Sequence, residues 1–400
     1  MDRKQIIAAY ISEIPNFLSI FLFPIFLISI SPILLDISNE LSINIEKLNI
    51  VLSFIIIGNI AGQLTAPFYS VKFSRFAIII TSYILLIPLT ISLFFISELF
   101  LFYIIYLFSG YCLGVIWIQS NSFLLESEIE NKNRLINVAL IFFPIGAIIA
   151  PLLSIIVSAM DLNWRYLYAI ILLFIVCIII IYILIKRKKT GSKVSEEEST
   201  GFKGIFLNKK YNIIFIISLL SLFFYGITET IIFTWAPTYF RIDQNISAQL
   251  AGLTVTIFWI AIAIGRVLVS IILCRIKPYI LAFCLSVLSL ISLAFMIFLS
   301  RGYVILIAIF FVGLGYSGLF SLIFSTSCLI YEKGKSILET MLFVATGLGA
   351  SLAPFITGFT LQLNLRLSIS TSMIFMMLVL LLLAINIINY KKFLKNQNVC

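Results

Sequence analysis

Residues 145–151 read IGAIIAP and residues 348–354 read LGASLAP, so the pattern Gly-Ala-x-x-Ala-Pro occurs twice, 203 positions apart (348 against 145). The same offset relates further pairs in other apolar runs: Gly62-Gln63 with Gly265-Arg266, Lys72 with Arg275, and Gly110 with Gly313. Glycine and proline are common in membrane helices, so one such pair arises easily by chance. A six-position pattern and several pairs in one register instead favour an internal duplication.

The chain is also far more apolar than a soluble domain. Hydrophobic residues make up 62% of its 400 residues, charged residues only 11%, and the mean hydropathy is +1.17. Polar residues fall in short clusters between apolar runs of roughly 20 residues, the length that crosses the hydrocarbon core as a helix. Because lipid offers no partner to unpaired backbone groups, these runs must be helical. The sequence predicts an all-α membrane protein.

The apolar runs and the repeat predict twelve transmembrane helices in two pseudo-symmetric six-helix bundles. The predicted spans are 11–35, 48–69, 76–97, 99–124, 134–158, 165–185, 211–235, 249–274, 278–299, 302–328, 336–362 and 367–389. The long connection contains KRKKTGSKVSEEESTGFKG and is charged and glycine-containing, as flexible linkers are. We therefore expect an N-terminal bundle at 1–185, a cytoplasmic linker at 186–210 and a C-terminal bundle at 211–400.

Lysine and arginine residues predict the orientation. One side of the predicted membrane collects Arg3, Lys4, Lys72, Arg75, Lys132, Arg134, the linker's basic residues, Arg275, Lys277, Lys333, Lys335, Lys391, Lys392 and Lys395. The other side has only Lys47, Arg165, Arg241, Arg301 and Arg366. The positive-inside rule then places both termini in the cytoplasm. We expect the chain to lie in the cell inner (plasma) membrane. The net charge of +10 lies beside membrane spans, so we expect the lipid bilayer, and no nucleic acid, as its partner.

Several kinds of chemistry are excluded by composition. The chain has no histidine, which removes Ser-His-Asp and Cys-His nucleophile systems and HExxH zinc sites. None of the six cysteines forms a CxxC pair, and there is no phosphate-binding glycine loop. The sequence therefore predicts no enzyme, no metal, no cofactor and no ATP-driven transport.

Four motifs carry a family resemblance. They are Asn121 in the fourth span, RLIN at Arg134 to Asn137 with Gly146 and Pro151 after it, WAPTYF at Trp235 to Phe240, and Gly265-Arg266. On these residues the chain resembles the major facilitator superfamily over its whole length, and within it the fucose-permease-like sugar symporters and the TsgA-like proteins. The resemblance implies two six-span halves that rock about a site near the midplane, with the fourth span lining a central cavity.

The chain also departs from the family pattern. The loop between spans two and three reads FYSVKFSRF, in which only Lys72 and Arg75 match the basic residues of the superfamily motif, so its gating contact is altered. Where the fucose-permease pattern has acids in spans one and four, this chain has Ser31 and Trp117. The proton-coupling role of those acids therefore does not transfer to this chain.

Glu229 is the leading candidate for proton coupling. It lies in FFYGITETIIFTW, twelve residues before Arg241, which is about 18 Å along a helix. An ionisable group near mid-membrane is costly and is a functional candidate by default, because it can load and release a proton as water access alternates. The alternative is a protonated glutamate that hydrogen-bonds across a helix contact without any role in transport.

Arg266 is the basic residue deepest inside a span, about 13 Å along the helix before Arg275. It can bind an anionic solute, form a salt bridge that breaks during rocking, or snorkel to the membrane surface. Its place after Gly265 favours a gating or structural bridge.

Polar and aromatic residues in spans two, four and seven are the substrate-binding candidates: Trp117, Gln119, Asn121, Asn59, Gln63 and Trp235. Trp117 and Asn121 share a helix face, as do Asn59 and Gln63. An aromatic plane beside an amide suits sugars, since an amide both donates and accepts hydrogen bonds. The alternative is hydrogen bonding between helices.

The sequence thus predicts a monomeric secondary active transporter that moves a small polar solute, coupled to protons, by alternating access. The alternatives are an exporter of toxic compounds and a membrane sensor or scaffold that has lost transport. In both fifth spans, we expect Gly146 and Gly349 to admit a neighbouring helix and Pro151 and Pro354 to bend their own helix.

Overall fold

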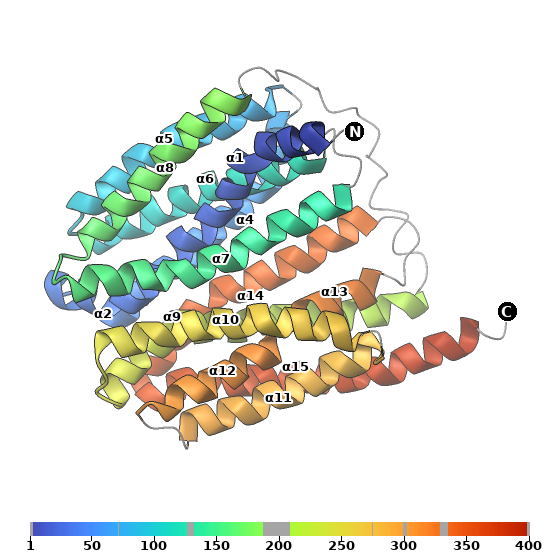
Figure 1. Cartoon of the computed structure of the whole chain (residues 1–400). Coiled ribbons are helices and arrows are strands. Elements are labelled where there is room, and N and C mark those ends of the chain that lie inside the picture. Colours follow the sequence, from blue (N-terminus) through green and yellow to red (C-terminus); the bar gives the residue numbers. More distant parts are fainter. Residues whose placement is uncertain are drawn as a thin grey trace. The chain divides into compact units, whose positions relative to one another are not determined.

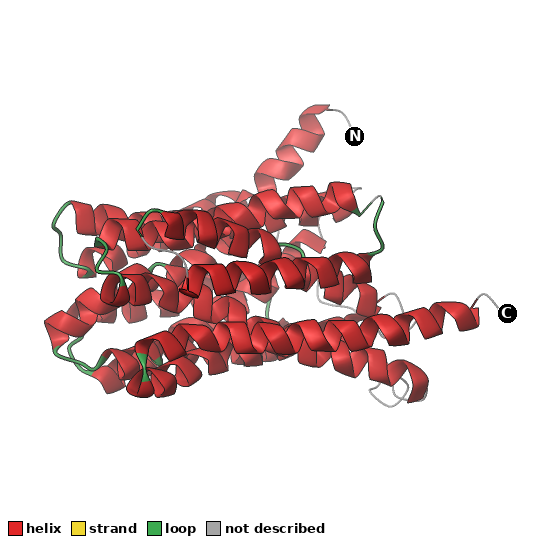
Figure 2. Ribbon diagram, turned by 90° about the horizontal axis from the view of Figure 1, so that it is seen from below, coloured by secondary structure: helices red, strands yellow, loops and turns green. Residues whose placement is uncertain are grey.

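The computed structural model describes residues 3–70, 72–125, 132–186, 209–273, 275–298, 302–328 and 335–397, and all regular secondary structure in these ranges is helical (Figure 1). Twelve of the helical segments are long and apolar enough to cross a membrane. Figure 2 shows these helices together with the short loops that join many of them. The prediction of an all-α membrane protein is confirmed.

The first half of the chain contains α1 (Arg3–Ile28), α2 (Ile30–Leu41), α3 (Ile45–Asn49), α4 (Val51–Ser70), α5 (Arg75–Phe95), α6 (Leu99–Leu125), α7 (Lys132–Ala159) and α8 (Arg165–Lys186). The second half contains α9 (Lys209–Asp243), α10 (Ala248–Ile272), α11 (Pro278–Phe298), α12 (Val304–Tyr316), α13 (Leu319–Cys328), α14 (Lys335–Leu363) and α15 (Leu365–Gln397).

The helices fall into two compact units, Met1–Ser195 and Glu196–Cys400. In Figure 1 the first unit runs from blue to green and the second from yellow to red. The boundary between the units falls within the predicted linker at 186–210, most of which lies outside the described residues. Each unit is described by itself below.

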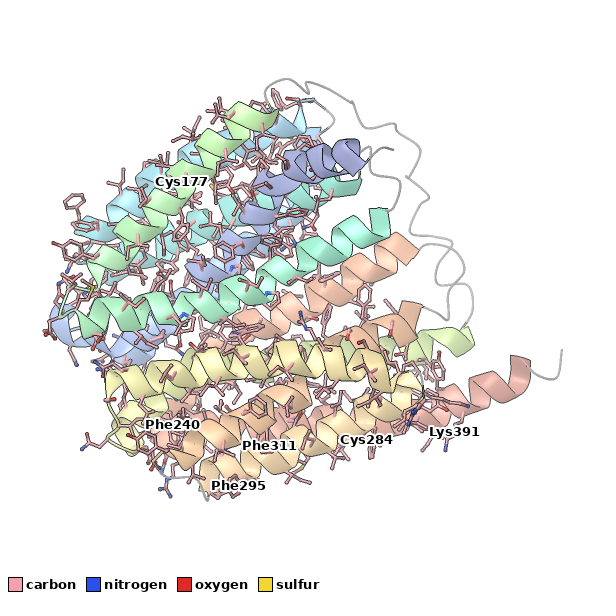
Figure 3. All side chains as sticks on the ribbon, viewed as in Figure 1. Cys177, Phe240, Cys284, Phe295, Phe311 and Lys391 are labelled. Atoms are coloured by element: carbon pink, nitrogen blue, oxygen red, sulfur yellow. The ribbon has the colours of Figure 1, made fainter. Side chains whose placement is uncertain are left out.

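Large apolar side chains cover much of the surface of both units (Figure 3). Phe95 and Leu184 are each 76% exposed, and Phe359 is 66% exposed. Such exposure in water would favour aggregation, whereas lipid accepts these side chains as readily as a protein core does. The outward apolar surface is therefore the side that a bilayer would cover.

Glycines make the closest helix contact of the first unit, between α4 and α6. A β-carbon added to Gly58 or Gly62 would collide with the backbone of α6, and one added to Gly110 or Gly114 would collide with the backbone of α4. Small residues let two helix backbones approach in this way, which compensates for the missing hydrophobic force between helices in lipid.

The second unit uses the equivalent positions in the same way. A β-carbon on Gly313 would meet the carbonyl oxygen of Phe258 in α10, and one on Gly265 would meet the side chain of Ser317 after α12. The glycine pairs that lie 203 positions apart therefore mark the same contact between the second and fourth spans of each half.

The repeated heptads also lie in matching contacts. Gly146 of α7 packs against the carbonyl oxygen of Phe21 in α1, and Gly349 of α14 packs against the carbonyl oxygen of Phe223 in α9. In each half the heptad thus packs the fifth span, α7 or α14, against the first helix, α1 or α9. The prolines that end the heptads lie inside α7 and α14, where each removes one backbone hydrogen bond from the helix.

Three spans that the sequence predicts as single helices are interrupted. The first span breaks at Ser29, between α1 and α2, the second breaks near its start at Ile50, between α3 and α4, and the tenth breaks at Ser317-Gly318, between α12 and α13. At the break in the tenth span the Ser317 N–H bonds the Leu314 carbonyl oxygen at 3.4 Å, and the helical ladder resumes when Leu322 N–H bonds the Gly318 oxygen at 2.9 Å. Hydropathy cannot show such breaks, because the residues on both sides remain apolar.

Candidate functional site

A carboxylate in the middle of α9 forms the centre of the candidate site. Glu229 is half-buried, and its Oε1 accepts a hydrogen bond of 2.6 Å from the hydroxyl of Tyr225, one turn earlier on the same helix. The span that contains it runs from Ile213 to Asp243, so Glu229 lies near its middle. This is the position that the sequence predicts for a proton-coupling residue.

The adjacent helix α10 adds a positive charge. Arg266 interacts electrostatically with both Glu229 and Tyr225, and its side chain is exposed at the surface of the second unit. No ion pair joins Arg266 to Glu229 within the described residues. The guanidinium therefore acts on the carboxylate from beyond direct contact, and either group can move without breaking a salt bridge.

Aromatic rings from the interrupted tenth span complete the cluster. Tyr225 packs against Tyr316 at the end of α12, with ring centroids 5.8 Å apart, and against Phe320 near the start of α13 at 6.5 Å. The charge of Glu229 also reaches Tyr316. Glu229, Tyr225, Arg266, Tyr316 and Phe320, named here the carboxylate cluster, thus lie where the span is broken.

The carboxylate cluster holds groups that favour opposite protonation states of Glu229. A donated hydrogen bond and a nearby guanidinium stabilise a carboxylate, whereas removal from water stabilises the carboxylic acid. Because these effects oppose each other, a change in water access or in the position of Arg266 shifts the balance. This is the property that a proton carrier needs.

Trp117 and Asn121 lie on one face of α6 in the first unit. The Trp117 ring packs on Phe23 at 5.6 Å and edge-on to Phe143 at 5.7 Å. Asn121 donates from its side-chain nitrogen to the Trp117 carbonyl oxygen at 2.8 Å. Both side chains are half-buried, so each keeps part of its surface open.

Gln119, between them in sequence, points elsewhere. Its side-chain nitrogen donates to the carbonyl oxygen of Ala66 at 2.9 Å and to the hydroxyl of Ser70 at 2.7 Å, and its oxygen accepts from Arg75 at 3.0 Å. Gln119 therefore ties α6 to the end of α4 and the start of α5. It shares a contact with Arg75, the predicted gating residue, while Lys72 in the same loop is exposed.

The other substrate-binding candidates form hydrogen bonds within one helix or between two helices. Gln63 donates to the Asn59 side-chain oxygen at 2.6 Å, and Asn59 is only 6% exposed. The Asn59 side-chain nitrogen has no hydrogen-bond partner in the described part of the chain. Trp235 is fully buried, and its indole N–H donates to the Ser368 hydroxyl of α15 at 2.6 Å, so this side chain joins two helices.

A buried polar network in the first unit was not predicted from the sequence. Asn16 donates to Glu13 at 2.5 Å and accepts from the Tyr182 hydroxyl at 2.6 Å, and Ser19 joins Tyr182 to Tyr83. Glu13 is 2% exposed, although it lies near the start of an apolar run and therefore resembles a span-edge residue. The spacing of Glu13, Asn16 and Ser19 on one helix face was the signal that could have revealed it.

The internal repeat shows that the two units differ in charge. Counting back 203 positions, Glu229 corresponds to Phe26, Arg266 to Gln63 and Phe320 to Trp117. At these three positions the first unit thus has a phenyl ring, an amide and an indole, where the second has a carboxylate, a guanidinium and a phenyl ring.

The fold and these sites can be compared with known proteins. Residues 17–337 match the family model of the Major Facilitator Superfamily. The chain belongs to this superfamily. Because the superfamily consists of transporters, the predictions of a transporter rather than an enzyme and of the superfamily fold are confirmed. The narrower resemblance to the fucose-permease-like branch stays a prediction.

Relatives in the Major Facilitator Superfamily include the glucose/mannose transporter GlcP of Bacillus subtilis (strain 168). It is 24% identical over 344 residues, which cover 84% of this chain and 83% of GlcP. Among solved structures, a D-xylose-proton symporter covers 94% of this chain and 96% of its own at a TM-score of 0.72 and 14% identity. The nucleoside transporter NupG covers 96% of this chain and all of its own at a TM-score of 0.76 and 13% identity. At these identities the structural matches show the fold alone.

Proposed function

We propose that this protein is a proton-coupled sugar transporter of the inner (plasma) membrane that works by alternating access, with both termini in the cytoplasm. The observation that carries the proposal is the mid-membrane pair of Glu229 and Tyr225, with Arg266 in electrostatic range. Glu229 is the proton carrier in this proposal. Arg266 is the group whose distance from the carboxylate changes between the two access states.

Two features support a sugar as the solute. The relative GlcP is named a glucose/mannose transporter, and one protein of the same fold is a D-xylose-proton symporter. In the first unit, Trp117 and Asn121 offer an aromatic ring and an amide on one half-buried helix face. A ring face packs against the apolar face of a sugar, and an amide pairs with its hydroxyl groups.

The proposed mechanism uses the two opposing influences on Glu229. When the cluster opens to the side of higher proton concentration, the carboxylate takes up a proton and its attraction to Arg266 is lost. The neutral Glu229 side chain can then rearrange together with the bound solute, because it no longer carries a charge into a low-dielectric region, while the positive charge of Arg266 stays on an exposed side chain. On the other side Glu229 releases the proton and the attraction to Arg266 returns.

The test is sugar uptake into proteoliposomes with an imposed pH gradient, acidic outside. The wild-type protein should concentrate labelled glucose or mannose, and the gradient should be necessary. Glu229→Gln should abolish this accumulation but retain exchange of internal for external sugar, because exchange needs no net proton movement. Glu46→Gln, which removes a carboxylate at the start of α3, serves as the matched control and should behave as wild type.

Each part of the proposal has an outcome that contradicts it. Gradient-driven accumulation by Glu229→Gln would exclude Glu229 as the proton carrier. Accumulation of nucleosides rather than hexoses would exclude a sugar as the transported solute. Movement of no solute in either direction by folded wild-type protein would favour the sensor or scaffold alternative.

A further inference from the structure

The corner of the second unit where α11 begins and α15 ends carries basic side chains without acidic partners. Arg275 and Lys277 lie immediately before α11, and Lys391 lies near the end of α15; all are exposed. No carboxylate pairs with these three in the part of the chain that the structure describes. Uncompensated positive charge at this density requires an anionic partner or solvent.

A pair of tyrosines fixes the geometry of this corner. The rings of Tyr279 and Tyr390 pack with centroids 5.1 Å apart, which ties the start of α11 to the end of α15. Lys277 lies two residues before one ring, and Lys391 directly follows the other. The ring contact therefore brings the chain segments that contain Lys277 and Lys391 to one corner, and Figure 3 shows Lys391 beside the start of α11.

The start of α11 adds to the positive potential. Pro278 is the first residue of the helix, and its first turn contains no acidic residue. The N–H groups at a helix N-terminus carry a partial positive charge that favours anions. Basic side chains and the helix end thus act in the same direction.

The surface next to the basic corner is apolar. Ile276 is 39% exposed, Ile280 is 37% exposed, and Ile388 on α15 is 56% exposed. A membrane presents phosphate groups first, then the interface, and then the acyl chains. The basic side chains, the tyrosine rings and the exposed aliphatic side chains suit these three layers in turn. A soluble anion would use only the first of these layers.

We propose that this corner, defined by Arg275, Lys277, Tyr279, Tyr390 and Lys391, binds the headgroup of an anionic phospholipid. The phosphate lies between the basic side chains, and the acyl chains lie along the isoleucines of α11 and α15. The inference is independent of the transported solute and of the role of Glu229.

The test measures binding of phosphatidylglycerol to the full-length purified protein in detergent by native mass spectrometry. In Lys277→Gln/Lys391→Gln the affinity should fall by roughly 25-fold, since each basic residue near a membrane surface contributes about fivefold. The matched control is Lys47→Gln/Lys72→Gln, which removes two exposed charges elsewhere and should change affinity less than twofold. Thermal melting confirms that both variants remain folded.

Three results would overturn the proposal. Equal weakening by the control pair would show diffuse charge rather than a site. Equally tight binding of phosphatidylcholine to the wild type would show that headgroup charge is irrelevant. Displacement of the lipid by millimolar glycerol phosphate would indicate a site for small soluble anions.

Discussion

Gly349 packs so closely on α9 that only a hydrogen fits between the two backbones. A β-carbon there would collide with the carbonyl oxygen of Phe223, and a backbone group cannot rotate away as a side chain can. We predict that Gly349→Ala destabilises the second unit by about 1–3 kcal/mol, the usual cost of overpacking a tight contact.

The measurement is the melting temperature in detergent, and the control variant is Leu348→Phe. Leu348 is the neighbouring residue but is 47% exposed, so added bulk there meets lipid or detergent instead of backbone. An unchanged melting temperature for Gly349→Ala would show that α9 and α14 can separate at no cost.

Single residues differ in how far the sequence predicts their surroundings. The isolation of Glu229 in an apolar run identifies it as a candidate site residue. Its partner Tyr225 lies four residues earlier, and residues at this spacing are neighbours on a helix surface. Gln119 and Asn121 look alike in sequence, yet one bonds Arg75 and the other its own helix. That difference depends on which neighbouring helix faces each residue, which composition does not encode.

At the scale of helical elements, both units fix the start of their last helix with an ion pair from an arginine in its first turn. In the first unit Arg165 of α8 forms an ion pair with Glu40 of α2, and in the second Arg366 of α15 pairs with Asp243 of α9 at 3.4 Å. An asparagine two residues earlier accepts from the arginine backbone N–H in each case. These two ion pairs lie at the same end of the repeat.

The two ion pairs differ in strength, which leads to a prediction. Arg165 also bonds the Ile96 carbonyl oxygen at 3.0 Å and lies over the Trp164 ring at 4.4 Å, and its side chain is 19% exposed. The Arg366 side chain is 58% exposed and its bond to Asp243 is long. We therefore expect Arg165→Gln to cost about 2 kcal/mol, as for a lost charged hydrogen bond.

Arg366→Gln should cost less than about 0.5 kcal/mol, as for an exposed ion pair. Comparing the melting temperatures of the two variants tests this directly, since each serves as the other's control. Equal losses would mean that burial and the extra partners of Arg165 contribute nothing.

Element boundaries show where prediction from sequence ends. The predicted spans agree with the twelve apolar helices because lipid imposes a minimum length and a continuous apolar character. The breaks at Ser29 and Ser317-Gly318 were not predicted, since a serine or glycine is tolerated within a helix as readily as at its interruption. The seventh span also extends to Asp243, beyond its predicted end at 235.

At the scale of the whole molecule, the repeat conserves packing and varies chemistry. Positions 203 apart hold glycines in the same helix contacts, whereas Glu229 and Arg266 have only Phe26 and Gln63 as counterparts. Packing is a requirement that both units share, so duplication predicts it. In the proposed function the charged groups serve proton coupling in one unit alone, so symmetry does not predict them.

The charge distribution along the whole chain gives a last prediction, on orientation. Basic residues concentrate at the ends of the spans that share a side with the two termini, and the positive-inside rule places that side in the cytoplasm. In a variant with all six cysteines replaced by serine, single cysteines at Lys72 and at Lys277 should react with a membrane-impermeant maleimide only after the cells are opened. A cysteine at Lys47, which lies on the short helix α3 at the start of the second span and is exposed, should react in intact cells. Because every span reverses direction, the opposite labelling at these positions would show that the entire molecule has the reverse orientation, with both termini on the outer side of the membrane.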